Sequence, residues 1–167
     1  YFLGFVSFGS EYKVMGLAPY GDPARFRPFF DEIVRTAEDG SFAIDPDLMS
    51  RLIVRDALFP QGVFYPWSLI RALGAARRPD EGIEQRHADV AAALQEALER
   101  AVMRMLERAR ATTGQRNLCL AGGVALNCTL NGKIARSGLF DRVWVQPAAH
   151  DAGTALDQAL GQFGIGL

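Results

Sequence analysis

The sequence has few cysteines, few histidines and no long apolar run, and each shortage excludes a class of protein. Its 167 residues include two cysteines, Cys119 and Cys128, and no CxxC pair. Neither a disulfide framework nor a cysteine-based zinc site is therefore expected, and we expect both thiols to be reduced and buried. No stretch is apolar enough to span a bilayer, so the sequence indicates no membrane protein.

The sequence also lacks an excess of charge of either sign. The formal net charge is -1, which gives no electrostatic case for nucleic acid or an anionic membrane as a partner. The short basic pair Arg77-Arg78 is expected to lie in solvent. The first residues carry neither an initiator methionine nor the pattern of a signal peptide, and we therefore expect an internal piece of a longer, cytoplasmic protein.

What is present is a globular composition, with 49% hydrophobic residues. The first half reads as helices separated by loops. We expect a helix over 10–18 with Ser10 as its N-cap, and an amphipathic helix over 24–37. An Asp39-Gly40 turn then leads into a short strand over 41–44.

The middle of the chain contains the clearest single element. After a stretch at 45–65 without a readable pattern, a short helix opens at Pro66-Trp67, and 75–82 reads as a linker. A helix of about 40 Å is then predicted over 84–112. Its apolar face is lined by Val90, Leu94, Ala97, Leu98, Ala101, Met105 and Ala109. The alanines predict close packing against another element, and His87 is expected on the surface.

The last third alternates strands and helices. Gly114 is a predicted C-cap of the long helix. A buried strand is expected over 117–121, a second strand over 142–146, and helices over 124–137 and 152–163. Strand, helix, strand, helix with short turns predicts an α/β fold with parallel strands.

The first segment that could carry chemistry is the run from Leu118 to Asn127, a strand that passes through Gly122-Gly123 into a helix. Glycines allow a ligand to approach the backbone, and a helix N-terminus offers free N–H groups. This pattern indicates a cradle for a nucleotide, although a tight turn without a ligand remains the alternative. It is neither a Walker loop, because Gly132-Lys133 is followed by Ile134, nor a G-x-G-x-x-G fingerprint.

The second segment, from Gln146 to Thr154, follows the second strand. Ligands of open parallel sheets bind at the carboxyl ends of the strands. Asp151 could be a metal ligand there, and Gly153 would leave room for a ligand. The alternative is that Asp151 caps the last helix.

A third segment, EYKVMGLAPYG at 11–21, has no mechanism by composition alone. Together and in this order, the three segments resemble signature stretches of the NodU/CmcH-type carbamoyltransferases, which act on antibiotics and nodulation factors. The resemblance covers nearly the whole chain.

The resemblance implies an actin-like (ribonuclease H-like) ATPase fold of two lobes, of which this chain would be the second. It implies an O-carbamoyltransferase that forms carbamoyl-adenylate from ATP and carbamoyl phosphate and transfers the carbamoyl group to a small-molecule hydroxyl. By the same resemblance the nucleotide would lie at Gly122, Gly123, Val124, Asn127 and Gly153. Asp151 would bind a catalytic metal, either Fe, Mn or Zn, with Mg accompanying the nucleotide.

The sequence also departs from the family pattern. Ala152 stands where a second acidic or amide residue often follows the metal aspartate, and Asp157-Gln158 interrupts the usual G-T-A-L-G-A-A-L run. Only His87 and His150 are present, so the family's H-x-x-x-H metal pair is absent from this sequence. We expect residues 1–83 to be a family-specific insert and linker, residues 84–167 to be the nucleotide-facing core, and the isolated chain to be inactive.

Two other functions remain open from the sequence. One is a tRNA threonylcarbamoyl-adenosine-type modifying enzyme, which the lack of a basic stripe disfavours. The other is a non-catalytic nucleotide-binding module of actin-like fold.

Overall fold

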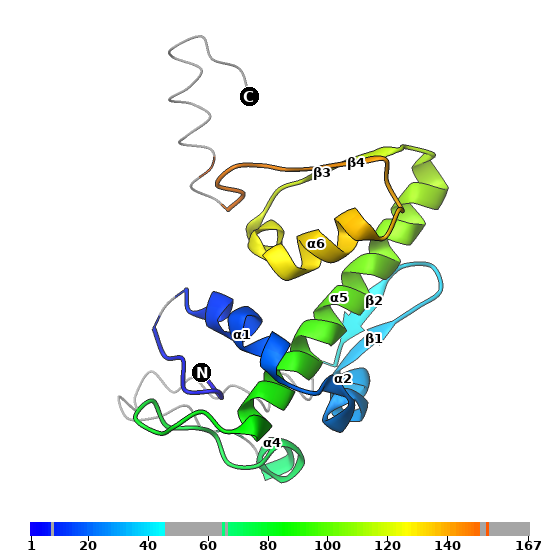
Figure 1. Ribbon diagram of the computed structural model, residues 1–167. Coiled ribbons are helices and arrows are strands. Elements are labelled where there is room, and N and C mark those ends of the chain that lie inside the picture. The colour runs from blue at the N-terminus through cyan, green and yellow to red at the C-terminus, as the bar shows by residue number, and fades with distance from the viewer. Residues whose placement is uncertain (8, 46–64, 66, 151–152, 154–167) are drawn as a thin grey trace, which may run out of the picture. The chain divides into compact units, whose positions relative to one another are not determined.

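The computed structural model describes residues 1–7, 9–45, 65, 67–150 and 153. The chain divides into two compact units, Tyr1–Met105 and Leu106–Leu167. The long helix α5, Gln85–Thr113, runs through the boundary between them (Figure 1). Among the described residues, no helix is both long and apolar enough to cross a membrane.

The first unit consists of short helices and a small hairpin before α5. They are α1 (Glu11–Leu17), η1 (Ala18–Tyr20), η2 (Pro23–Arg25), α2 (Arg27–Ile33), β1 (Val34–Thr36), β2 (Phe42–Ile44) and α4 (Trp67–Leu73). The helices predicted near 10–18 and after 66 are confirmed. Residues 46–64 and Pro66 lie outside the described residues.

The predicted helix over 24–37 is wrong at its end. It stops at Ile33, and Val34 begins β1, which pairs antiparallel with β2 in the register Val34↔Ile44. The intervening turn is the predicted one, since Gly40 has φ 80° and the Ser41 N–H donates to Asp39 Oδ1 at 2.8 Å. The hairpin therefore overrides the helical spacing, because cross-strand pairing stabilises a β-branched residue in the extended form.

Ser10 precedes α1 but does not cap it through its side chain. Its hydroxyl makes no cap hydrogen bond, and its ψ of 9° departs from the extended backbone that directs an N-cap oxygen at the first turn. The position was predicted correctly and the capping contact was not.

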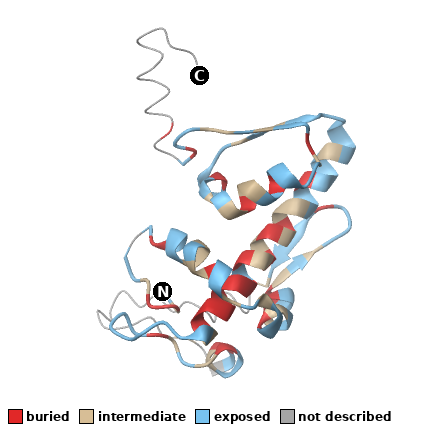
Figure 2. Cartoon of the chain, in the orientation of Figure 1, coloured by how far each residue is buried: buried red, intermediate tan, exposed pale blue. Residues whose placement is uncertain are grey.

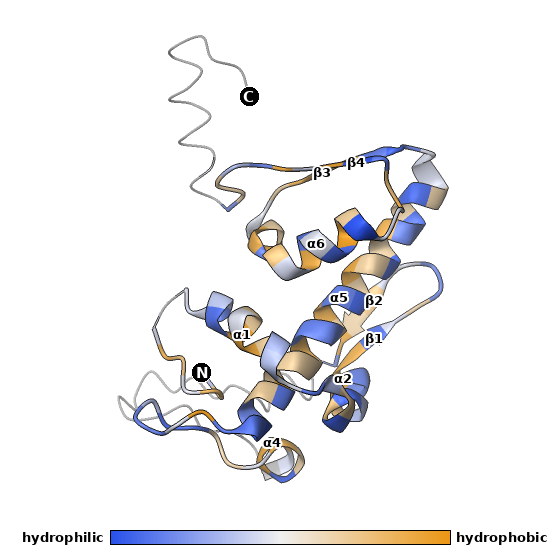
Figure 3. Ribbon diagram, viewed as in Figure 1, coloured by the Kyte–Doolittle hydropathy of each residue, from blue (hydrophilic) through white to orange (hydrophobic). Residues whose placement is uncertain are grey.

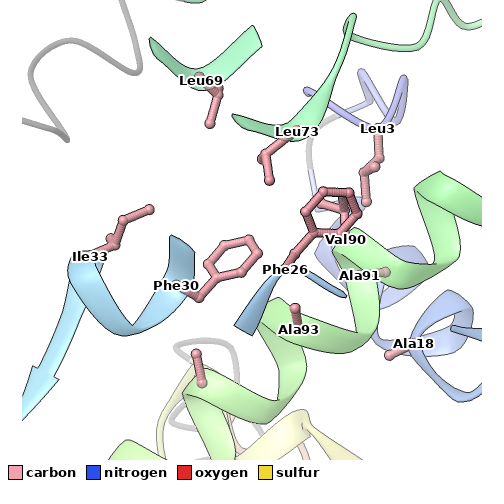
Figure 4. Packing of buried hydrophobic residues seen from close by; sticks show 11 residues of the cluster. Leu3, Ala18, Phe26, Phe30, Ile33, Leu69, Leu73, Val90, Ala91 and Ala93 are labelled. Atoms are coloured by element: carbon pink, nitrogen blue, oxygen red, sulfur yellow. The ribbon is translucent and has the colours of Figure 1, made fainter. Parts of the chain in front are cut away.

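The core of the first unit forms where α2 and α4 pack on α5 (Figure 4). It contains Leu3, Ala18, Phe26, Phe30, Ile33, Leu69, Leu73, Val90, Ala91, Ala93 and Ala97. Ala91, Ala93 and Ala97 are 0–1% exposed, so the alanines do allow close approach to α5. Leu94 and Met105 are 41% and 43% exposed, which contradicts the predicted continuous apolar face. Hydrophobic and hydrophilic segments alternate along α5 (Figure 3).

Two basic side chains predicted in solvent are buried instead. His87 is 2% exposed and Arg77 is 8% exposed; burial is concentrated in the first half of α5 (Figure 2). The Arg77 guanidinium donates to the carbonyl oxygens of Leu3 and Glu81. The predicted linker is irregular in backbone and mostly exposed, but it is anchored by Arg77, whose guanidinium satisfies these carbonyl groups.

The second unit is a β-α-β arrangement. β3 (Asn117–Leu120) leads through η3 (Gly123–Leu126) and α6 (Cys128–Arg136) to β4 (Arg142–Val145). The two strands are parallel neighbours with Asn117↔Arg142 and Leu120↔Val145, as predicted. Gly114 ends α5 with φ 68°, and its N–H donates to the Arg110 carbonyl, which confirms the C-cap.

The strand β3 is not buried, although the sequence predicts its burial. Exposed and half-buried residues alternate along both β3 and β4, and both cysteines are exposed, where burial was expected. Among the described residues this sheet has two strands, and the residues buried on α6 are Leu130 and Ile134. Apolar strand composition alone could not show how much of the sheet is covered.

Candidate functional site

The two segments predicted to carry chemistry meet at the carboxyl end of the parallel strands. The Gln146 N–H donates to the Leu120 carbonyl at 2.9 Å, which extends the β3–β4 ladder by one step. The Gly122 N–H then donates to the Ala149 carbonyl at 2.7 Å. The glycine turn and the loop after β4 are thus joined backbone to backbone.

The glycine turn exposes its main chain. Gly122 has φ 95° and ψ 166°, a conformation that L-residues rarely adopt. Among the described residues, no heavy atom lies within 4 Å of where a Cβ on Gly122 or Gly123 would stand. Val124 is 54% exposed. The shape of this backbone therefore allows a ligand to approach it closely.

Asn127 separates η3 from α6, where a single helix over 124–137 was predicted. Its backbone is extended, with φ -76° and ψ 92°, and its Oδ1 accepts from the Leu130 N–H at 3.0 Å. The residue is therefore the N-cap of α6. Its predicted contact with a nucleotide stays a prediction beside this structural role.

The loop after β4 contains a close backbone approach. The Gly153 N–H donates to the His150 carbonyl at 2.7 Å, and a Cβ on Gly153 would lie 2.2 Å from the Ala148 oxygen. Ala148 itself has φ 52°. The Ala148 carbonyl therefore excludes any side chain at position 153, whether or not a ligand also uses the space beside Gly153.

Within the described ranges, no three His, Cys, Asp or Glu side chains come together to hold an ion. Asp151 and the predicted helix over 152–163 lie outside those ranges, apart from the helical Gly153. His150, next to Asp151 in sequence, is exposed.

The first unit holds a cluster that composition did not predict. Asp89 on α5 accepts from the Asp22 N–H at 2.9 Å, from Gln85 Nε2 at 2.9 Å and from Arg25 at 3.2 Å. Gln85 Nε2 also donates to the Tyr20 carbonyl at 2.9 Å. These contacts attach the end of the EYKVMGLAPYG segment to α5.

Gly21 explains why this attachment is so close. A Cβ on Gly21 would lie 2.0 Å from the Ala88 oxygen, so only glycine fits against the α5 backbone. The same segment leaves Tyr12 and Tyr20 62% and 75% exposed. The sequence signal for the cluster was limited to Asp89, an acidic residue beside the apolar Val90 in the predicted helix.

Hydrogen-bond donors stabilise the ionised form of the Asp89 carboxyl. Burial raises the pKa of this carboxyl, but the hydrogen bonds from Asp22, Gln85 and Arg25 outweigh burial and keep the pKa below its ordinary value. Asp89 is 4% exposed, so its donors replace water that the carboxylate loses on folding.

Comparison with known proteins places the whole of this arrangement in one family. Residues 1–160 match the family model described as carbamoyltransferase N-terminus. Nodulation protein NolO of Bradyrhizobium diazoefficiens is 47% identical over 90% of the chain, and nodulation protein NolNO of Sinorhizobium fredii is 45% identical over 95%. An uncharacterized Synechocystis protein is 38% identical over 96%. The chain spans 24%, 21% and 25% of these relatives, respectively.

Proposed function

This chain belongs to the carbamoyltransferase N-terminus family, and we propose that it is part of an ATP-dependent O-carbamoyltransferase. In this proposal it is the second lobe of an actin-like ATPase domain. Residues 84–167 form the nucleotide-facing core, and residues 1–83 form a family-specific insert. The parallel β3–β4 pair and the connecting α6 support an α/β fold of this kind.

The proposed reaction has two stages. In the first, water cleaves carbamoyl phosphate to carbamate and phosphate, and a carbamate oxygen attacks the α-phosphorus of ATP to give carbamoyl-adenylate as pyrophosphate leaves. In the second, the oxygen of a small-molecule hydroxyl attacks the carbamoyl carbon. The bond from that carbon to the AMP phosphate oxygen breaks, AMP leaves and the hydroxyl proton passes to a base. The acceptor is a natural product or glycan, which is consistent with two relatives being named nodulation proteins.

The observation that carries the proposal is the joined backbone of the glycine turn and the loop after β4. The Gly122 N–H to Ala149 carbonyl bond, at 2.7 Å, brings two of the family-like segments to one edge of parallel strands. Ligands of open parallel sheets bind at this edge. ATP there would contact the open backbone of Gly122 and Gly123 and the exposed Val124.

The metal is a further part of the proposal. Asp151 would supply one carboxylate ligand, and the remaining ligands would come from parts of the enzyme beyond this chain, because a catalytic site usually needs about three. Fe, Mn or Zn would suit a carboxylate and histidine set, with Mg on the nucleotide. For the same reason, the isolated chain is expected to bind ATP and metal weakly and to transfer no carbamoyl group.

The test is ATP binding to the full-length enzyme, measured by calorimetry for wild type, Gly123→Val and Gly82→Val. Both glycines have open space where a Cβ would stand, and neither has a positive φ, so both variants should fold. Gly123→Val should weaken ATP binding at least tenfold by filling the space beside the backbone. Gly82→Val should bind as wild type. Equal affinities of all three proteins would remove ATP from the glycine turn.

A further inference from the structure

Asn131, on α6, contacts the turn that precedes its own helix. Its Nδ2 donates to the Ala125 carbonyl at 2.7 Å, and Ala125 is the buried residue of η3. The contact therefore reaches back across Asn127 to the part of the glycine turn that carries the exposed Val124. The Ala125 N–H in turn donates to the Gly122 carbonyl at 3.0 Å.

The other end of the same amide has no donor. Asn131 Oδ1 is buried and accepts no hydrogen bond within the described part of the chain. Exchanging the amide oxygen and nitrogen would not help, because two acceptors would then face each other at Ala125. A buried acceptor without a donor lowers stability. The cost of this unsatisfied oxygen offsets the stability gained from the hydrogen bond of Nδ2. Stability alone therefore does not explain an asparagine at this position.

We infer that Asn131 is a positioning residue, which fixes the glycine turn in the conformation that receives the nucleotide. This inference rests on the proposed function. The Asn131 amide donates to the Ala125 carbonyl, and the Ala125 N–H donates to the Gly122 carbonyl. This chain of two hydrogen bonds keeps the open backbone at Gly122 and Gly123 in one geometry. Asn131 itself does not touch the ligand, since its free oxygen is buried.

The test separates positioning from stability with Asn131→Leu in the full-length enzyme. Leucine is close in volume and removes the orphaned oxygen together with the donor. The urea midpoint should change little, because a lost hydrogen bond and a lost unsatisfied acceptor oppose each other. The dissociation constant for Mg-ATP, measured by calorimetry, should rise about tenfold.

A matched control is Ser137→Ala. Ser137 Oγ donates to the Ile134 carbonyl at 2.7 Å and accepts from the Leu139 N–H at 3.1 Å. This variant therefore also loses side-chain hydrogen bonds to the backbone, at the end of α6 away from the glycine turn. Its Mg-ATP affinity should equal that of wild type. A second variant, Asn131→Asp, keeps the shape but cannot donate when ionised, and its Mg-ATP affinity should recover as the pH falls and the carboxyl gains a proton.

The outcomes are distinct. Weakened Mg-ATP binding by Asn131→Leu at an unchanged urea midpoint supports the inference. Unchanged binding, or binding and midpoint that fall together by matching amounts, overturns it. If the wild-type enzyme binds no Mg-ATP, the proposed function fails, and the inference fails with it. If Asn131→Leu does not fold, the pH recovery of Asn131→Asp decides, and no recovery overturns the inference.

Discussion

Asp89 on α5 accepts a hydrogen bond from the backbone N–H of Asp22, 67 positions earlier, at 2.9 Å. The contact fixes the end of the EYKVMGLAPYG segment against the first half of α5. The other carboxylate oxygen of Asp89, Oδ2, lies 3.2 Å from the Arg25 guanidinium. One buried carboxylate thus holds the end of a segment with two exposed tyrosines, Tyr12 in α1 and Tyr20 in η1.

Asp89→Asn should destabilise the first unit by about 1–3 kcal/mol, since an amide leaves one of these donors without an acceptor. Urea denaturation followed by circular dichroism measures the change. Asp80→Asn is the control, because Asp80 pairs with Arg78 in solvent, and its midpoint should match wild type. Equal midpoints for the two variants would show that Asp89 does not hold the loop.

Gly21 and Gly16 should respond to alanine with opposite signs. In Gly21→Ala the new methyl would lie 2.0 Å from the Ala88 oxygen, and the loop must move away from α5 at a cost of about 1–3 kcal/mol. Gly16 is exposed within α1 and has open space around it. Gly16→Ala should therefore stabilise the chain by roughly 0.5–1 kcal/mol through helix propensity. Denaturation midpoints that shift in the same direction would contradict this account.

His87 predicts a pH dependence. Its Nδ1 accepts from the Glu84 N–H at 2.9 Å, and the Arg86 guanidinium lies 2.9 Å from Nε2. Burial first, and then the charge of Arg86, lower the pKa of His87, although Glu84 and Glu81 oppose them. Because the folded pKa is below the unfolded one, stability is full above the unfolded value of about 6.5 and is lost as the pH falls through the folded value.

His87→Gln should remove most of this loss. A glutamine at the third helical position can accept from the same N–H without titrating. Urea midpoints between about pH 7.5 and pH 5 measure the effect. The control His150→Gln alters an exposed histidine and should keep the wild-type dependence. A wild-type slope in His87→Gln would assign the pH dependence to other groups.

The sequence predicted the elements better than their surroundings. The 29-residue α5, the parallel strands and the Gly40 and Gly114 turns follow from local patterns. Val34 was misassigned because strand pairing is a non-local contact that helical spacing does not record. His87 and Arg77 were placed in solvent because residue type alone does not show which carbonyl or N–H will satisfy a buried polar group.

The candidate site was predictable in the same uneven way. The glycine turn and the loop after β4 were found from their residues, since glycines and strand ends have local signals. Their joining through the Gly122 N–H and the Ala149 carbonyl, the capping role of Asn127 and the Asp89 cluster depend on tertiary contacts. No single-sequence pattern encodes these contacts directly.

The neighbouring glycines of the turn should separate folding from binding. Gly122 has φ 95°, so Gly122→Ala should cost roughly 1–2 kcal/mol of stability through backbone strain. Gly123 has no positive φ and open space around it, so Gly123→Ala should keep the urea midpoint. A loss of stability in Gly123→Ala equal to that in Gly122→Ala would show that the turn is not as described.

The most direct test of the central claim is the exchange of labelled pyrophosphate into ATP by the full-length enzyme, with and without carbamoyl phosphate. Formation of carbamoyl-adenylate releases pyrophosphate reversibly, so exchange should require carbamoyl phosphate. It should fall at least tenfold in Gly123→Val at a fixed, subsaturating ATP concentration and persist in Gly82→Val. Exchange that does not depend on carbamoyl phosphate, or that is unaffected by Gly123→Val, would contradict an adenylate-forming carbamoyltransferase with its nucleotide at this turn.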